Sequence, residues 1–216
     1  MSAIAEKIDW LNETSATWEA YEPAVKTILS STFIQQGGSG FLFDPIALEE
    51  SLMVDLFNRL TSLHQTQSLF IVLTNANHER ATLSAFINRL QIPVIAHEDA
   101  LPFLELQPTQ VLTGAEGIFQ DTSWFRIPGA PPGEIALFFS SHGGTIVLGD
   151  SLINLTETGF TFLPDKYCEN PARMHQSLQK LLGLHVTHLF MAHGTPLLQN
   201  VPTQLQILLK KNTTAS

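Results

Sequence analysis

Four short segments carry the side chains that could do chemistry. They are residues 73–80 (Leu-Thr-Asn-Ala-Asn-His-Glu-Arg), 128–133 (Pro-Gly-Ala-Pro-Pro-Gly), 149–150 (Gly-Asp) and 192–194 (Ala-His-Gly). Each follows or ends a predicted strand, so each lies at a loop edge, where functional sites are usually built. Glu79, Asp150 and His193 bear the carboxylate and imidazole groups that zinc accepts as ligands. The pattern predicts one cleft at the strand edges.

Two other motifs resemble known functional motifs but lack the residues or the position that those motifs require. Residues 37–40 (Gly-Gly-Ser-Gly) lack the lysine of a phosphate-binding loop and lie between two apolar runs, which is typical of a hairpin turn. Residues 149–152 spell the Gly-Asp-Ser-Leu block of an esterase family that carries it near the N-terminus and has a late Asp-x-x-His. Here the block comes late, and residues 185–188 (His-Val-Thr-His) lack the aspartate. The match is taken as chance, with Ser151 kept as a weak nucleophile candidate.

Composition indicates a globular chain with few charges. Of 216 residues, 44% are hydrophobic and 14% are charged, which favours one domain over residues 1–216 with a core that needs no disulfides. The formal net charge of −9 argues against a nucleic-acid partner, because binding to phosphates requires basic residues. The single cysteine, Cys168, excludes an internal disulfide and a four-cysteine metal cluster.

The sequence offers no membrane or export signal. No apolar run approaches the ~20 residues of a membrane-spanning helix. Residues 1–10 mix Glu6, Lys7 and Asp9 with short apolar residues and do not read as a signal peptide. We therefore expect a cytoplasmic protein without a membrane partner.

The elements that must position the four segments follow from hydrophobic periodicity. In the first half we expect a hairpin over 33–43, a helix over 48–63, a strand over 69–73, a helix over 83–90 and a strand over 93–97. In the second half we expect strands over 118–127, 134–140, 145–148 and 186–192, and helices over 170–183 and around 205–209. Two half-chains of this kind predict an α/β fold, a four-layer αββα sandwich.

The order and spacing of the four segments resemble the metallo-β-lactamase superfamily over most of the chain. That family reads strand–Thr-His-x-His-x-Asp-His–helix, then Pro-Gly-His-Thr-Pro-Gly, then Gly-Asp, then strand–His-Gly. The dipeptide at 44–45 (Asp-Pro) and the loop at 164–166 (Pro-Asp-Lys) are also similar to family features. The resemblance implies an αββα fold and a zinc-dependent hydrolase as the ancestral activity.

Laid on this chain, most zinc-ligand positions of the family are changed. Asn75, Asn77 and Ala130 stand where the family has the three histidines of its first zinc site. Amide and methyl groups are too weak to hold zinc there. Glu79 falls on the aspartate of the first motif. Asp150 and His193 remain as in the family.

Arg80 stands where the family has the last histidine of the first motif. Its guanidinium is positively charged and would repel a divalent cation. We expect Arg80 to replace the metal by bonding to the acids Glu79 and Asp150, with an alternative in which it points to solvent. His78 lies at a variable position that faces sideways in the family, so packing or capping is expected. General-base chemistry by His78 stays an alternative.

Three functions remain open on the sequence. The favoured one is a metal-free, non-hydrolytic homologue that holds a small-molecule or protein partner in a cleft of Asn75, Asn77, Glu79, Arg80, Asp150 and His193. The alternative is a single-metal hydrolase of small esters or thioesters, with zinc or another divalent metal on Glu79, Asp150 and His193. The weakest is metal-free hydrolysis through Ser151 and His193. Candidate catalytic residues are Asp150, His193 and His78; an oligomer is compatible with the sequence.

Overall fold

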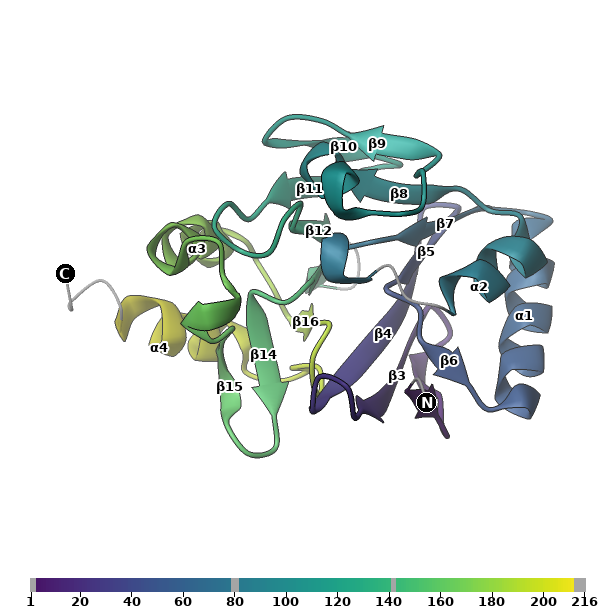
Figure 1. The fold of residues 1–216 in the computed structure, drawn as a ribbon, viewed down its shortest axis with the longest axis horizontal. Helices are drawn as coiled ribbons and strands as arrows, with labels where there is room; N and C mark the ends of the chain where they lie inside the picture. Colours follow the sequence, from purple (N-terminus) through teal and green to yellow (C-terminus); the bar gives the residue numbers. More distant parts are fainter. Residues whose placement is uncertain (1–2, 79–81, 141–142, 212–216) are drawn as a thin grey trace.

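Two β-sheets lie face to face with helices on their outer sides (Figure 1). The computed structural model describes residues 3–78, 82–140 and 143–211. The larger sheet contains, in spatial order, β2 (Asp9–Asn12), β3 (Ser15–Glu22), β4 (Thr27–Gln36), β5 (Ser39–Phe43), β7 (Ser68–Val72), β8 (Val94–His97) and β9 (Gln110–Leu112). The smaller sheet contains β10 (Glu116–Phe119), β11 (Thr122–Arg126), β12 (Ile135–Phe139), β13 (Thr145–Leu148) and β16 (His188–Phe190).

Short pairs of strands complete the edges of the fold. β1 (Ile4–Ala5) pairs in parallel with β6 (Ala47–Leu48), and β14 (Leu152–Leu155) forms an antiparallel hairpin with β15 (Gly159–Phe162). The β14–β15 hairpin projects beside the central sheets in Figure 1.

The helices divide into one pair for each sheet. α1 (Glu50–His64) and α2 (Leu83–Leu90) pack on the larger sheet, and α3 (Pro171–Leu178) and α4 (Val201–Lys211) pack on the smaller one. A third apolar cluster lies between the sheets, where the rings of Phe41 and Phe139 meet edge to face at 5.3 Å. The predicted αββα sandwich is therefore confirmed, and both faces of each sheet are covered.

Several local predictions are confirmed by backbone geometry. The predicted hairpin turns at Gly37 and Gly38, whose φ values of 59° and 83° are easily reached by glycine. Asn170 caps α3, because its side chain accepts a hydrogen bond from the backbone N–H of Arg173. The strand–helix–strand unit of β7, α2 and β8 is also present, with the two strands parallel.

Other local predictions are wrong. The single strand expected over 118–127 is a hairpin, because Gln120 and Asp121 turn the chain with φ values of 47° and 59° without any glycine. α3 ends at Leu178, and a 3₁₀ turn carries the chain on to Gly183. The long strand β3, with the buried Trp18, was not expected.

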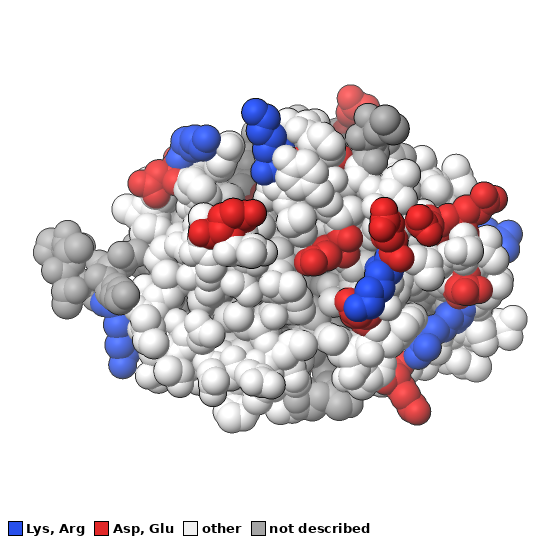
Figure 2. Space-filling view, turned by 90° about the horizontal axis from the view of Figure 1, so that it is seen from below, with Lys and Arg blue, Asp and Glu red and all other residues white. Residues whose placement is uncertain are grey.

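Charged side chains are sparse on the surface. Figure 2 shows one face of the molecule, on which acidic and basic residues are intermingled between wide uncharged areas and form no basic stripe. Within the described part of the chain, no helix is long and apolar enough to span a membrane.

Candidate functional site

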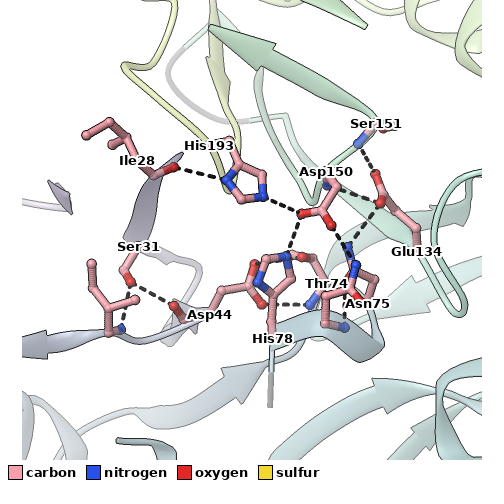
Figure 3. A network of polar contacts seen from close by, with 12 residues as sticks. Ile28, Ser31, Asp44, Thr74, Asn75, His78, Glu134, Asp150, Ser151 and His193 are labelled. Carbon is pink, nitrogen blue, oxygen red and sulfur yellow. Dashed lines mark hydrogen bonds and ion pairs between the residues drawn. The ribbon is translucent and has the colours of Figure 1, made fainter. Parts of the chain in front are cut away.

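The polar segments predicted from the sequence meet at one edge of the two sheets. Residues 74–78 follow β7, Asp150 follows β13 and His193 follows β16, so the carboxyl ends of strands from both sheets supply the site (Figure 3). Backbone hydrogen bonds tie the segments together: the N–H of Ile135 donates to the carbonyl of Thr74 (2.9 Å). Gly149 lets the segment before Asp150 pack closely against Asn75, because a Cβ at position 149 would lie 2.7 Å from the Asn75 amide nitrogen.

Asp150 is the centre of the site. Its Oδ1 accepts hydrogen bonds from the Nε2 atoms of His78 (2.8 Å) and His193 (3.1 Å), and its Oδ2 accepts from the Nδ2 of Asn77 (2.9 Å). Burial alone would raise the pKa of this carboxyl, which is 3% exposed. The charges of the two imidazoles and their hydrogen bonds outweigh burial and hold the pKa well below its ordinary value. Asp150 is thus a carboxylate with three donors.

His193 faces an acceptor with each of its ring nitrogens. Nδ1 lies 3.0 Å from the carbonyl oxygen of Ile28, and Nε2 faces Asp150. A carbonyl and a carboxylate can only accept here, so this geometry favours the doubly protonated imidazolium. Neither nitrogen is then placed to take a proton from water. The following residue, Gly194, has a φ of 81°, and a Cβ would lie 2.0 Å from the Asn154 carbonyl oxygen.

Glu134 is a buried member of the site that the sequence analysis missed. Its Oε2 accepts hydrogen bonds from the Asn75 side chain (3.1 Å) and the Asp150 backbone N–H (3.0 Å), and its Oε1 accepts from the Ser151 N–H (2.8 Å). Burial, followed by the charge of Asp150, raises the pKa of Glu134 to about 8, and the donors offset this in part. The sequence did offer one signal for Glu134, because it is an acidic residue at the start of the apolar strand predicted over 134–140.

Asp44 holds the start of the same loop. Its carboxylate accepts hydrogen bonds from the backbone N–H (2.9 Å) and the hydroxyl (2.6 Å) of Thr74, and its carbonyl accepts from the Ser31 hydroxyl (2.7 Å). The φ of Asp44 is 46°, a conformation that aspartate tolerates better than most residues. Asp44 therefore orients the chain just before Asn75.

The structure brings together most of the predicted site residues. Asn75, Asn77, Asp150 and His193 lie in one hydrogen-bonded network. Glu79 and Arg80 fall outside the described residues, so the predicted replacement of the metal by Arg80 stays a prediction. The sideways orientation expected for His78 is wrong. A 3₁₀ turn over Ala76–His78 directs its ring to Asp150, with the side chain 2% exposed.

A cavity of about 940 Å³ opens above this network. Asn77, His78, Asp150 and His193 form its polar floor, and most other lining residues are apolar. The volume is within the range of small-molecule sites, ~300–1,000 Å³. The network therefore lies at the base of a cleft that can admit a ligand.

Comparison with known proteins identifies the fold. No protein-family model and no curated protein sequence matches the chain. Solved structures do match: DIM-1 metallo-β-lactamase exposed to ceftazidime has 14% identity and a TM-score of 0.73, with 100% of both chains covered. The mono-zinc form of FIM-1 from Pseudomonas aeruginosa has 12% identity and a TM-score of 0.70, covering 98% of this chain and 97% of that one. A metallo-β-lactamase from Erythrobacter litoralis has 14% identity and a TM-score of 0.67, covering 94% and 96%. The chain has the metallo-β-lactamase fold.

The zinc that this fold implies does not fit the described side chains. Asn75 and Asn77 present amides that donate to Glu134 and Asp150, and Ala130 is a buried methyl. Asp150 already accepts three hydrogen bonds. In residues 3–78, 82–140 and 143–211, no three His, Cys, Asp or Glu side chains are arranged to hold a metal ion. The donor set is that of a hydrogen-bonded network.

Stability should fall with rising pH because of Glu134. Its pKa is about 8 in the folded state against 4.5 ordinarily, so the folded protein binds the extra proton between these values. The stabilisation is complete below the ordinary pKa and is lost as the pH rises through the folded one. We expect urea unfolding to show a larger loss between about pH 6 and about pH 9 for the wild type than for Glu134→Gln. Equal losses would contradict this prediction.

Proposed function

We propose that this protein is a metal-free, non-hydrolytic binding homologue on the metallo-β-lactamase fold. The observation that carries the proposal is the state of Asp150: hydrogen bonds from His78, His193 and Asn77 occupy the carboxylate that would otherwise meet a metal. An internally satisfied network needs no cation to remain buried. The cleft above it is kept, and we propose that it holds a small molecule.

The arrangement of possible bases also favours binding over hydrolysis. Both nitrogens of His193 face acceptors, so it does not activate a nucleophile. The Ser151 side chain is fully buried, and its backbone N–H is held by Glu134. A serine that water and substrate do not reach is a poor nucleophile, which weighs against hydrolysis through Ser151 and His193.

The test is the metal content of untagged protein, followed by its activity after addition of zinc. We expect well below one zinc per chain by elemental analysis, and no hydrolysis of p-nitrophenyl acetate or a simple thioester above a buffer control, with or without zinc. A zinc-loaded metallo-β-lactamase purified in the same way is the positive control for the metal analysis.

Two results would overturn the proposal. Two zinc ions per chain would show that the amides at Asn75 and Asn77 do not prevent a family-like site. One metal per chain with zinc-dependent hydrolysis would favour the single-metal hydrolase on Glu79, Asp150 and His193.

A further inference from the structure

The two imidazoles at the floor of the cleft are turned toward protein atoms. The rings of His78 and His193 both point at Asp150, and their Nε2 atoms lie 2.8 and 3.1 Å from its Oδ1 (Figure 3). The Nδ1 of His193 lies 3.0 Å from the Ile28 carbonyl oxygen, and the His78 side chain is 2% exposed. A ligand at the floor must therefore find its hydrogen bonds at Asp150 and at Asn77, the other two polar residues there.

Asp150 and Asn77 still have hydrogen-bonding capacity, and both line the cavity. Among the described residues, the Asp150 Oδ2 accepts one hydrogen bond, from the Asn77 Nδ2 (2.9 Å), so an ionised carboxylate keeps one acceptor position there. This contact fixes the orientation of the Asn77 amide, because only its nitrogen can donate to a carboxylate. The Asn77 Oδ1 accepts no hydrogen bond from a described residue, and its Nδ2 has a second N–H. The floor thus leaves two acceptors and one donor for a ligand.

The charges at the floor are balanced within the described part of the chain. The buried carboxylates of Asp44 and Asp150 lie 3.9 and 2.8 Å from the His78 Nε2, and His193 supplies a second imidazole. A ligand with a charged end would lose hydration at this floor without meeting an unpaired charge of opposite sign. The floor therefore favours a neutral polar group.

The walls above the floor are apolar and lead to an exposed mouth. Leu29, Ile153 and Leu163 line the cavity and are at most 7% exposed. Val25 and Tyr167 also line it, and they are 60% and 57% exposed. Burial of apolar surface is the main attraction that such walls offer, so the body of the ligand is apolar.

The mouth gives no preference for a charged ligand. Glu22 and Lys26 both line the cavity near the exposed β3–β4 turn, and their charges have opposite signs. At the floor, in contrast, an apolar group would cover polar atoms and remove their water without replacing its hydrogen bonds. The polar end of the ligand therefore lies at the floor, and its apolar end lies toward the mouth.

We infer that the cleft binds a neutral primary carboxamide with an apolar body. Its two N–H groups match the open acceptors, the Asp150 Oδ2 and the Asn77 Oδ1, and its carbonyl oxygen matches the remaining N–H of Asn77. The apolar body lies between the walls and points to the mouth. This inference rests on the proposed binding function and gives that function a ligand class.

The test compares four probes of similar length by isothermal titration calorimetry, below their micellar concentrations: octanamide, 2-nonanone, octanoate and octylammonium. The ketone has the shape of octanamide, with a methyl group in place of the NH₂, and is the more hydrophobic of the two. We expect one octanamide per chain, bound roughly tenfold more tightly than 2-nonanone or octanoate, because neither of these can donate to the floor. Octylammonium should bind roughly fivefold more weakly than octanamide, because its charge is not compensated there.

A pair of variants tests the position of the amide. Asn77→Leu keeps the approximate volume of the side chain and removes both of its polar atoms, so the preference for octanamide over 2-nonanone should fall by roughly fivefold. Asn88→Leu, at an exposed position of α2, is the matched control and should keep the preference. Circular dichroism verifies the fold of both variants. The wild-type series needs no variant, so it decides the ligand class even where Asn77→Leu lowers stability.

The outcomes separate this inference from the proposed function. Octanamide that binds no more tightly than 2-nonanone, tightest binding of either charged probe, or no binding of any probe would overturn the ligand class. An unchanged preference in folded Asn77→Leu would overturn the position of the amide at the floor. None of these results alters the metal content on which the proposed function is tested. Zinc in the purified protein would overturn the proposed function, whatever the calorimetry shows.

Discussion

Glu134→Ala is expected to lower the free energy of unfolding by roughly 3–5 kcal/mol. The substitution removes the acceptor of three buried donors: the Asn75 side chain and the backbone N–H groups of Asp150 and Ser151. Each buried donor left without an acceptor costs about 1–3 kcal/mol, and no longer burying the Glu134 carboxyl offsets part of the sum. Urea unfolding followed by far-UV circular dichroism measures the loss.

The control for this prediction is Glu157→Ala, at an exposed position in the β14–β15 turn. It should change stability by less than about 0.5 kcal/mol. Glu134→Gln should lie between the two, because one end of its amide can still accept while the other meets an N–H donor. A Glu134→Ala protein as stable as the control would show that these hydrogen bonds do not hold the Asn75 and Asp150 loops together.

Asp150→Ala is expected to cost about 3–5 kcal/mol for a different reason. It leaves the imidazoles of His78 and His193 and the Asn77 amide without their shared acceptor in a buried site. The lowered pKa of Asp150 means that its contribution is present above the ordinary value of 3.8 and is lost as the pH falls through the folded value. Thermal melting near neutral pH measures the effect while Asp150 is ionised.

Asp55→Ala, on the exposed side of α1, is the matched control and should melt close to the wild type. Asp150→Asn should recover part of the loss, because its amide oxygen still accepts one hydrogen bond. If Asp150→Ala instead melts higher than the wild type, the donors from His78, His193 and Asn77 do not compensate the buried carboxylate, which contradicts this prediction.

Local patterns in the sequence were sufficient to predict the layers of the fold. The run Phe41-Leu42-Phe43 is apolar at every position because β5 is covered on both faces: the two phenylalanines point between the sheets and the leucine points to the helices. Turns without glycine were not predictable in this way. Gln120 and Asp121 adopt positive φ values because the β10–β11 pairing requires it, and that pairing is not visible in their own residue types.

The site was predictable in its segments and less so in its contacts. Asn75, Asn77, Asp150 and His193 were found because each lies just beyond a strand, and strand ends meet at one edge. The orientation of His78 was missed because it depends on a 3₁₀ turn that only the packed loop specifies. Glu134 was missed because its donors come from residues 59, 16 and 17 positions away in the sequence.

The sequence by itself determined which chemistry is available at each position: amides at 75 and 77, a methyl at 130, a carboxylate at 150 and an imidazole at 193. Side-chain type is a local property, so these groups are known without any fold. Only the tertiary structure decided that Asp150 bonds to His78 and His193, and that Glu134 clamps the loop beneath them. The hydrogen-bond partners of a buried polar group come from segments that are distant in the sequence. Only folding brings these segments together and excludes water from between them.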